Sequence, residues 1–168
     1  MTRDTPYFQS VHSVNSKGEV LEQRDQVRAD GTRQKVLSTY QDGLWTTKRE
    51  GPQGTLELRY GKGLQSFDVE RIGDRVSATL TLLSNGRVSS RGRIEAEVMR
   101  KDELRIGRCT YSVFVVHSKL SFSDGNQIYR EAFYQPDLRL TVAGVTMNPD
   151  WTPRTGVFFD KIETVRFK

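Results

Sequence analysis

Apolar and polar residues alternate with a period of two through the middle of the chain, between residues 54 and 100. Three segments show the pattern most clearly: 55–60, 76–83 and 93–98. In the first of them, Leu56, Leu58 and Tyr60 lie on one side and polar residues lie on the other. A period of two is typical of a strand with one face in a core and the other in water. The pattern therefore predicts half-buried β-strands.

Short clusters that contain glycine separate these runs, at residues 15–18, 29–31, 41–43, 51–54, 61–63, 72–74, 84–86 and 123–126. Asp-Gly and Asn-Gly pairs supply the positive φ angles that tight hairpins need. Consecutive strands should therefore pair in one antiparallel sheet of roughly ten to twelve strands, too many to stay flat. We predict an all-β fold with a single antiparallel, strongly curved sheet that forms a half-barrel or partly open barrel. A β-sandwich is the alternative.

Three segments outside the clearest alternating runs also predict secondary structure. Residues 18–28 have apolar positions at helical spacing but few of them, so we favour a strand over a helix there. Residues 148–156 contain two prolines and predict a surface loop before a last strand at 157–167. The Gly-Lys-Gly at 61–63 predicts a hairpin turn.

Composition places the chain among polar globular domains. With 168 residues, 35% of them hydrophobic and 28% charged, it can form one thin apolar core. No repeat or linker interrupts it, so we expect a single β domain over residues 1–168, with residues 1–6 disordered or added for expression. The net charge of +5 suits an anionic partner. The densest basic tract, 87–93, lacks aromatics and any nucleic-acid-binding motif, so we predict a solvated strand edge and no nucleic acid partner.

Membrane and compartment signals are few. The longest apolar run, 113–116, is far shorter than the roughly 20 residues of a membrane-spanning helix, so no transmembrane segment is expected. The first ten residues contain no apolar stretch, and a signal peptide is not present in this chain. One cysteine excludes an internal disulfide and leaves the compartment open.

Nucleophilic catalysis by Cys109 would need a nearby base. His117 lies further along the same predicted strand, about 26 Å away, and nothing in the sequence directs His12 toward the thiol. We therefore predict a buried, structural cysteine.

Other catalytic and cofactor signatures do not occur in the sequence. Its His, Cys, Asp and Glu residues show no metal-ligand spacing, and there is no phosphate-binding loop, dinucleotide fingerprint or nucleophile elbow. We therefore predict no metal, no cofactor and no catalytic residue. With 21 acidic residues, a carboxylate pair brought together from separate strands stays open as a lesser alternative.

The segment 109–122 is apolar on both faces of a predicted strand. One parity carries Cys109, Tyr111, Val113 and Val115, and the other carries Phe114, Val116, Leu120 and Phe122. The dominant face changes between Val115 and Leu120, which predicts a β-bulge or a bend. A covering helix, a dimer partner or an apolar ligand would account for burial on both sides.

An aromatic stretch follows the predicted hairpin turn at 123–126. Tyr129, Phe133 and Tyr134 lead to Pro136, where a strand must turn or reach an edge because proline cannot donate to a sheet. These side chains are the best candidates for the wall of an apolar cavity. The ligand-binding residues that we predict are Phe114, Val116, Tyr134, Leu138 and Leu140.

The last third of the chain resembles a group of bacterial envelope proteins of unknown function, the DUF3108 and TapB-like group. The resemblance consists of CTYSVFVV at 109–116, a hairpin, and a Y-x-P-x-L step in YQPDLRLTV from Tyr134. It implies an extracytoplasmic curved β-sheet related in shape to the lipoprotein-carrier half-barrels, with a groove for an acyl chain or a hydrophobic peptide. The resemblance therefore implies a periplasmic or envelope-associated location.

These observations favour a non-catalytic extracytoplasmic domain that binds a lipid or another apolar ligand in a concave face. The alternative is a module for protein–protein interaction or homodimerisation, which would use the same apolar surface. An enzyme based on carboxylates is the lesser alternative.

Overall fold

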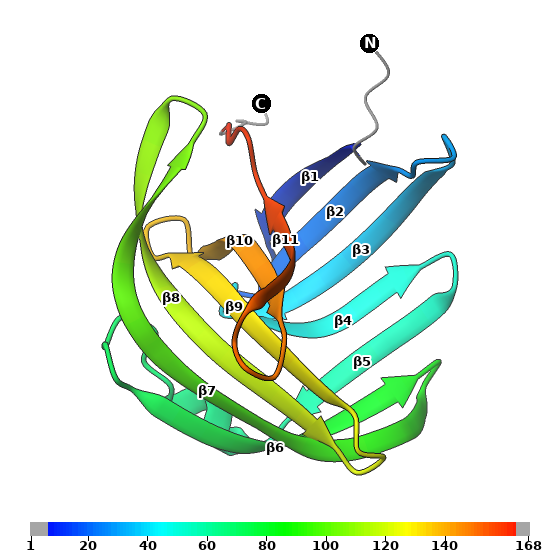
Figure 1. The fold of residues 1–168 in the computed structure, drawn as a ribbon. Helices are drawn as coiled ribbons and strands as arrows, with labels where there is room; N and C mark the ends of the chain where they lie inside the picture. Colours follow the sequence, from blue (N-terminus) through cyan, green and yellow to red (C-terminus); the bar gives the residue numbers. More distant parts are fainter. Residues whose placement is uncertain (1–6, 164–168) are drawn as a thin grey trace. The chain divides into compact units, whose positions relative to one another are not determined.

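The computed structural model describes residues 7–163, which form eleven strands and one short 3₁₀-helix (Figure 1). In chain order these elements are β1 (Tyr7–Val14), β2 (Val20–Val27), β3 (Arg33–Gln41), β4 (Trp45–Gly51), β5 (Gly54–Tyr60), η1 (Lys62–Ser66), β6 (Arg75–Ser84), β7 (Arg87–Ile106), β8 (Cys109–Phe122), β9 (Gln127–Gln135), β10 (Leu140–Met147) and β11 (Pro153–Phe158). The order of the strands in the sheet is their order in the chain. The predicted fold class is confirmed in that the protein is all-β, with one antiparallel sheet of consecutive strands.

Turn chemistry sets this order. Between β6 and β7, Asn85 and Gly86 have φ angles of 49° and 80°, as a two-residue hairpin turn requires. Gly125, with a φ angle of 90°, lies in the predicted turn between β8 and β9. Since such turns connect adjacent antiparallel strands, each strand pairs with the next one along the chain. The predicted strand within residues 18–28 is confirmed as β2.

Two other sequence predictions are wrong in their details. Gly61 precedes the 3₁₀-helix η1 rather than lying in a hairpin turn. Leu64 of this helix is buried, whereas a hairpin turn would be exposed. The last strand lies at Pro153–Phe158, within and just beyond the predicted loop, and residues 159–163 are not in a strand. Pro153 begins β11, a position where its missing N–H costs no ladder hydrogen bond. The predicted disorder of residues 1–6 lies outside the described residues.

The chain folds into two compact units. The first contains residues 7–59 and 80–91 of the described chain, and the second contains residues 60–79 and 92–163. The apolar core of the first unit is made by Val20, Val36, Leu44, Trp45, Leu80 and Leu83. The second unit holds most of the fully buried side chains, which are Leu64, Ile94, Val98, Val113, Val115, Val116 and Val142. That these two units belong to a single β domain over residues 1–168 stays a prediction.

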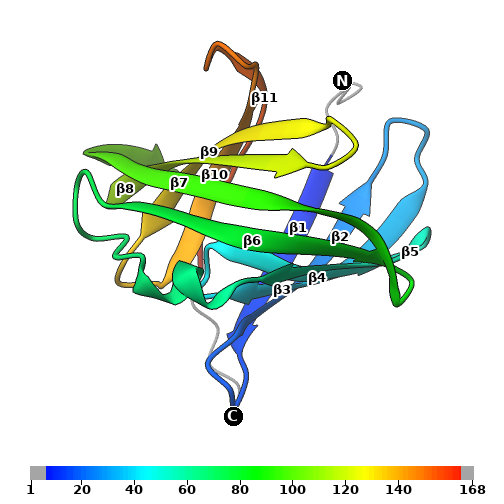
Figure 2. The same ribbon diagram turned by 90° about the horizontal axis from the view of Figure 1, so that it is seen from below.

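Strand β8 is apolar on both faces near its middle, as predicted, because Val113, Phe114, Val115 and Val116 are all buried. Alternate side chains point to opposite sides of a strand. We call the side of Val113, Val115 and His117 the Val115 face, and the side of Phe114, Val116 and Ser118 the Val116 face. Figure 2 shows β8, β9 and β10 side by side, so each face continues across three strands.

The irregularity expected in β8 lies in its neighbour β7. The register of β7 against β8 shifts between Val98 and Arg100, which makes Met99 an extra residue. Strand β8 pairs with β9 without interruption from Phe114 to Ser121. An apolar run within one strand cannot indicate which of two paired strands contains the bulge.

The protein's own chain covers part of the Val115 face. Ile106, Val113 and Val142 form a buried cluster, and Phe159 and Ile162, which follow β11, pack against it. Neither a covering helix nor a second protein is needed to bury this side of β8.

The basic tract at 87–93 begins a strand that extends past its partner. Pairing between β7 and β8 starts at Gly92, so residues 87–91 have no pairing with β8, and their side chains are largely exposed. The predicted solvated strand edge is therefore confirmed. Within residues 7–163 no helix is both long enough and apolar enough to cross a membrane.

Candidate functional site

The five predicted ligand-binding residues do not come together. Phe114 and Tyr134 are directly opposite each other in β8 and β9, and Val116 lies on the same Val116 face. Their exposed fractions are only 8%, 6% and 1%, so they belong to the core. Leu138 lies exposed in the turn after β9, and Leu140 packs at the cluster of the Val115 face. The β9–β10 turn separates these two leucines because Arg139 has a φ angle of 53° and redirects the chain.

Cys109 is exposed, so the prediction of a buried cysteine is wrong. It is the first residue of β8, opposite Ile106, and follows directly after the two-residue connection from β7. The buried apolar cluster includes Ile106 and stops short of Cys109. The hydroxyl of Tyr111 is hydrogen-bonded with Cys109, and burial raises the pKa of that tyrosine.

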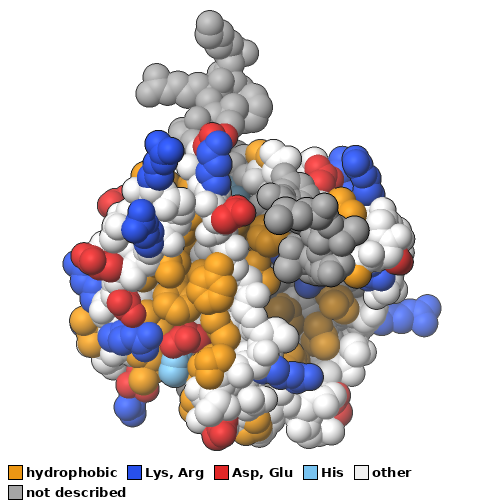
Figure 3. Space-filling view, turned by 45° about the horizontal axis from the view of Figure 1, so that its top comes forward, with side chains coloured by type: hydrophobic (Ala, Val, Ile, Leu, Met, Phe, Trp, Pro, Cys, Tyr) orange, Lys and Arg blue, Asp and Glu red, His pale blue; other side chains and the backbone are white. Residues whose placement is uncertain are grey.

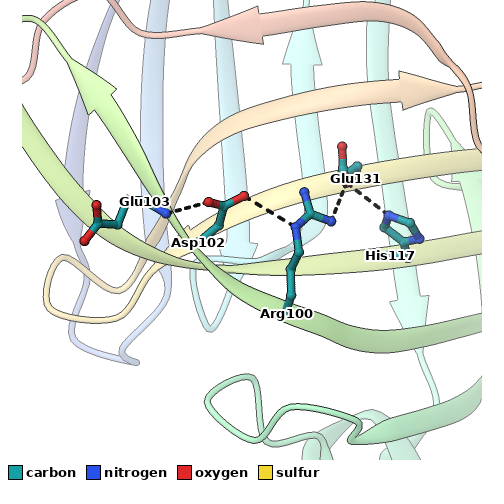
Figure 4. A network of polar contacts seen from close by, with 5 residues as sticks. All are labelled: Arg100, Asp102, Glu103, His117 and Glu131. Carbon is teal, nitrogen blue, oxygen red and sulfur yellow. Dashed lines mark hydrogen bonds and ion pairs between the residues drawn. The ribbon is translucent and has the colours of Figure 1, made fainter.

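A charged network occupies the Val115 face next to this core (Figure 4). His117 and Glu131 are opposite each other in β8 and β9, and His117 Nε2 lies 3.1 Å from Glu131 Oε1. Arg100 Nη1 lies 3.5 Å from the same carboxylate oxygen. Arg100 Nε lies 3.4 Å from Asp102, which accepts a 2.8 Å hydrogen bond from the Glu103 N–H. The network therefore joins β7, β8 and β9.

Trp151 covers the histidine of this network. Its ring stacks on His117 with centroids 4.2 Å apart and planes 8° from parallel. Tyr129 packs edge-on against the same indole at 5.2 Å, and Lys119 Nζ lies 5.5 Å from the centre of the tyrosine ring. Aromatic pairs in these geometries contribute about 0.5–1.5 kcal/mol each beyond the burial of their area. The indole is thus held from two sides.

The β10–β11 loop is built to hold Trp151 in this place. Trp151 has a φ angle of 63°, a left-handed conformation that is uncommon for a bulky residue. Its N–H donates to the Asn148 carbonyl, and the Asn148 N–H donates to the Thr152 carbonyl, both at 2.8 Å. Asp150 accepts hydrogen bonds from the Thr152 hydroxyl and N–H at 2.6 and 3.0 Å, and these bonds lower the pKa of Asp150. Backbone strain stored in such a turn is a pointer to function.

Four aromatic rings lie on this side of the sheet in two contacting pairs, Tyr129 with Trp151 and Phe133 with Phe158. We call Tyr129, Phe133, Trp151 and Phe158 the aromatic surface. Phe158 of β11 lies 6.1 Å from Phe133 between ring centroids, and its ring lies over Gly156. Val157 and Phe158 are 41% and 53% exposed. Figure 3 shows hydrophobic side chains gathered on one face beside a histidine and acidic and basic groups.

The polar groups of the network contact one another. The Glu131 carboxylate is already neutralised by Arg100 and contacted by His117, while Trp151 covers one side of the imidazole. Within residues 7–163 no group of three His, Cys, Asp or Glu side chains is placed to hold a metal ion. The network therefore lies beside half-buried rings, and its charged groups are engaged with one another.

A second polar centre lies in the first unit, around buried Glu22 of β2. Its carboxylate contacts Arg24 at 2.7 Å, Tyr40 at 3.0 Å, Ser10 at 3.1 Å and His12 at 3.3 Å. Burial alone would raise the pKa of Glu22, but the contacts with His12, Arg24 and Tyr40 outweigh it and lower the pKa to about 2. Four partners use most of the acceptor capacity of one carboxylate. This centre therefore links β1, β2 and β3.

Sequence reasoning missed the charged network, although one signal for it was present. A hairpin turn centred on Asp124 places His117 opposite Glu131, because the two residues are equally far from the turn. The contribution of Trp151 has no such signal, since it depends on a left-handed residue in a loop. Comparison with protein-family models, with curated proteins and with solved structures found no match for this chain.

Proposed function

We propose that this protein is a non-catalytic binding module that recruits an extended segment of a partner protein to the edge strand β11. The observation that supports the proposal is the exposure of β11. It is the last strand of the sheet, it pairs only with β10 among the described strands, and all six of its residues are exposed.

The backbone of β11 supplies the affinity in this proposal. In an antiparallel pair, alternate residues direct their N–H and C=O groups toward the neighbouring strand, and the remaining groups point away from it. An edge strand therefore presents a row of donors and acceptors to an added strand. Pro153 lies at the start of β11, so it does not interrupt this row.

The side chains of β11 indicate the chemistry of the partner segment. Gly156 and Phe158 share one side of the strand and Thr155 and Val157 share the other, while Arg154 is an extra residue where the register against β10 shifts. Cross-strand pairs favour an acidic residue opposite arginine and an apolar residue opposite phenylalanine. The net charge of +5 also favours an acidic partner. We infer an extended peptide that is apolar at alternate positions and carries at least one acidic residue.

The aromatic surface supplies anchors beside this edge. Trp, Tyr and Arg are the residue types most enriched among those that dominate binding energy. Trp151 is held in place before binding by His117 and Tyr129, so less conformational entropy is lost when a partner packs against it.

Selection of octapeptides from a random library on the immobilised protein tests this function. We expect enrichment of alternating apolar peptides that contain acidic residues, and a loss of their binding of about tenfold or more in the Phe158→Lys variant. Val88→Lys, at a similarly exposed apolar residue of β7, is the control and should bind normally. Unselective peptides, or equal binding by both variants, would contradict the proposal. A concentration-dependent dimer in light scattering that Phe158→Lys abolishes would instead assign β11 to self-association.

We also propose a periplasmic or envelope-associated location, on the strength of the sequence resemblance. Fractionation of cells that express the natural gene, with marker enzymes for each compartment, tests it. Recovery with the cytoplasmic markers would contradict it.

A further inference from the structure

Arg130 of β9 lies on the Val116 face of the second unit, opposite Ser118 of β8. Its side chain extends over the neighbouring strand β10 at Gly144. A Cβ atom added to Gly144 would lie 3.1 Å from Arg130 Nη2 and 3.4 Å from Nε. The missing side chain of Gly144 therefore leaves room for the guanidinium to lie close to the sheet.

Arg130 has no counter-ion among residues 7–163. Two arginines of the described chain are half-buried, Arg24 and Arg130. Arg24 lies 2.7 Å from Glu22, whereas no ion pair between described residues includes Arg130. Glu131, the next residue, belongs to the charged network on the opposite face. A half-buried guanidinium without an anion is costly, because charges removed from water are normally paired.

Hydroxyl groups surround this charge. Ser118 is opposite Arg130 on one side and Thr146 is opposite it on the other. Arg130 is also close enough to Tyr60 for its charge to act on the tyrosine hydroxyl, whose pKa is raised by burial and lowered in part by Arg130. These groups can donate to an anion that the guanidinium holds.

An apolar patch adjoins the charge on the same face. Ile128 precedes Arg130 by two residues, about 7 Å along the strand, and is 46% exposed. Leu120 of β8 is directly opposite Ile128. The guanidinium of Arg130 and the apolar side chains of Ile128 and Leu120 are therefore close enough for one molecule with a short alkyl chain to contact both.

We propose that Arg130 binds the carboxylate of a single-chain amphiphile, such as a fatty acid, whose alkyl chain lies on Leu120 and Ile128. The planar guanidinium matches a carboxylate through two parallel hydrogen bonds. This site uses the Val116 face and does not depend on the partner site at β11. It differs from the ligand site predicted from the sequence, whose residues Phe114, Val116 and Tyr134 are buried.

Calorimetric titration of the whole protein with decanoate, 1-decanol, acetate and decyl phosphate tests this site. We expect decanoate to bind, and to bind about 10- to 100-fold more tightly than either decanol or acetate, because each of these lacks one of the two contacts. Equal binding of decanol, or of acetate, would overturn the proposal. Tighter binding of decyl phosphate than of decanoate would overturn the assignment to carboxylates. No heat and no rise in melting temperature with decanoate would overturn the site itself.

Variants separate this site from general hydrophobic binding. Arg130→Met should weaken decanoate binding about 10- to 100-fold and leave decanol binding unchanged, while Arg91→Met, at an exposed arginine, is the matched control. Gly144→Ala keeps the charge but displaces the guanidinium, so it should weaken decanoate binding several-fold. Circular dichroism checks that each variant is folded. Normal decanoate binding by both Arg130→Met and Gly144→Ala would overturn the proposal.

Discussion

Removal of the Trp151 side chain tests how the β10–β11 loop is built. Trp151→Ala loses the stacked contact with His117 and the edge contact with Tyr129. At about 0.5–1.5 kcal/mol for each aromatic pair, we expect a loss of about 2 kcal/mol in the free energy of unfolding. The backbone at residue 151 stays left-handed, with a φ angle of 63° in the wild type.

Glycine at this position should reverse the usual order of stability. In an ordinary strand, glycine is less stable than alanine by about 0.5–1 kcal/mol. A left-handed residue other than glycine costs about 1–2 kcal/mol. The Trp151→Gly variant should therefore be about as stable as Trp151→Ala or more stable, by up to about 1 kcal/mol. Trp151→Phe retains a stacked ring and should stay within about 1 kcal/mol of the wild type.

Urea denaturation followed by far-UV circular dichroism measures all three variants. A loss below about 0.5 kcal/mol in Trp151→Ala would refute the claim that the ring is anchored. A Trp151→Gly variant clearly less stable than Trp151→Ala would refute the left-handed conformation of the loop.

Three further predictions follow from buried or exposed groups. The pKa of Glu22 is lowered to about 2 from 4.5, so its ionised form stabilises the fold above about pH 4.5, and that stability is lost as the pH falls toward 2. Wild type and Glu22→Gln should differ by about 3 kcal/mol in the free energy of unfolding at pH 7. In urea titrations this difference should shrink as the pH falls from 4.5 to 2. A Cβ at Gly92 would lie 1.8 Å from the Ser121 carbonyl oxygen, so Gly92→Ala should lower the free energy of unfolding by about 3 kcal/mol or more. The control is Gly51→Ala, whose added Cβ has its nearest contact at 3.8 Å and should lower the free energy of unfolding by less than about 1 kcal/mol in the same urea titrations. Cys109 is exposed, so the native protein should react with a thiol reagent as fast as the urea-unfolded protein, and slow native labelling would contradict this exposure.

The fold could be predicted from the sequence because its signals are local. Alternation assigns one face of strands such as β6 to the core, and Asn-Gly or Asp-Gly turns join β2 to β3, β3 to β4, β6 to β7 and β8 to β9. Together they also imply contacts between distant residues, as with His117 and Glu131 on either side of the turn at Gly125.

The features that could not be predicted from the sequence depend on contacts that no local pattern encodes. The bulge at Met99 lies in β7, although the apolar run that suggested it lies in β8. Arg130 rests on Gly144 of another strand, and only the register of β9 against β10 brings them together. Cys109 is exposed although cysteine is usually buried and Ile106 opposite it is buried, so neither residue type nor position in the hairpin predicts its exposure.

Hydrogen exchange of the β11 amides gives the most direct test of the account. In the free protein, the amides of Arg154–Phe158 that point away from β10 should exchange rapidly, because no strand within residues 7–163 covers that edge. On addition of a peptide selected on this protein, these amides should become protected, while the amides of β1 at the other edge of the sheet stay unchanged. Protection elsewhere in the chain, with β11 left unchanged, would contradict the proposal that β11 binds an extended partner segment.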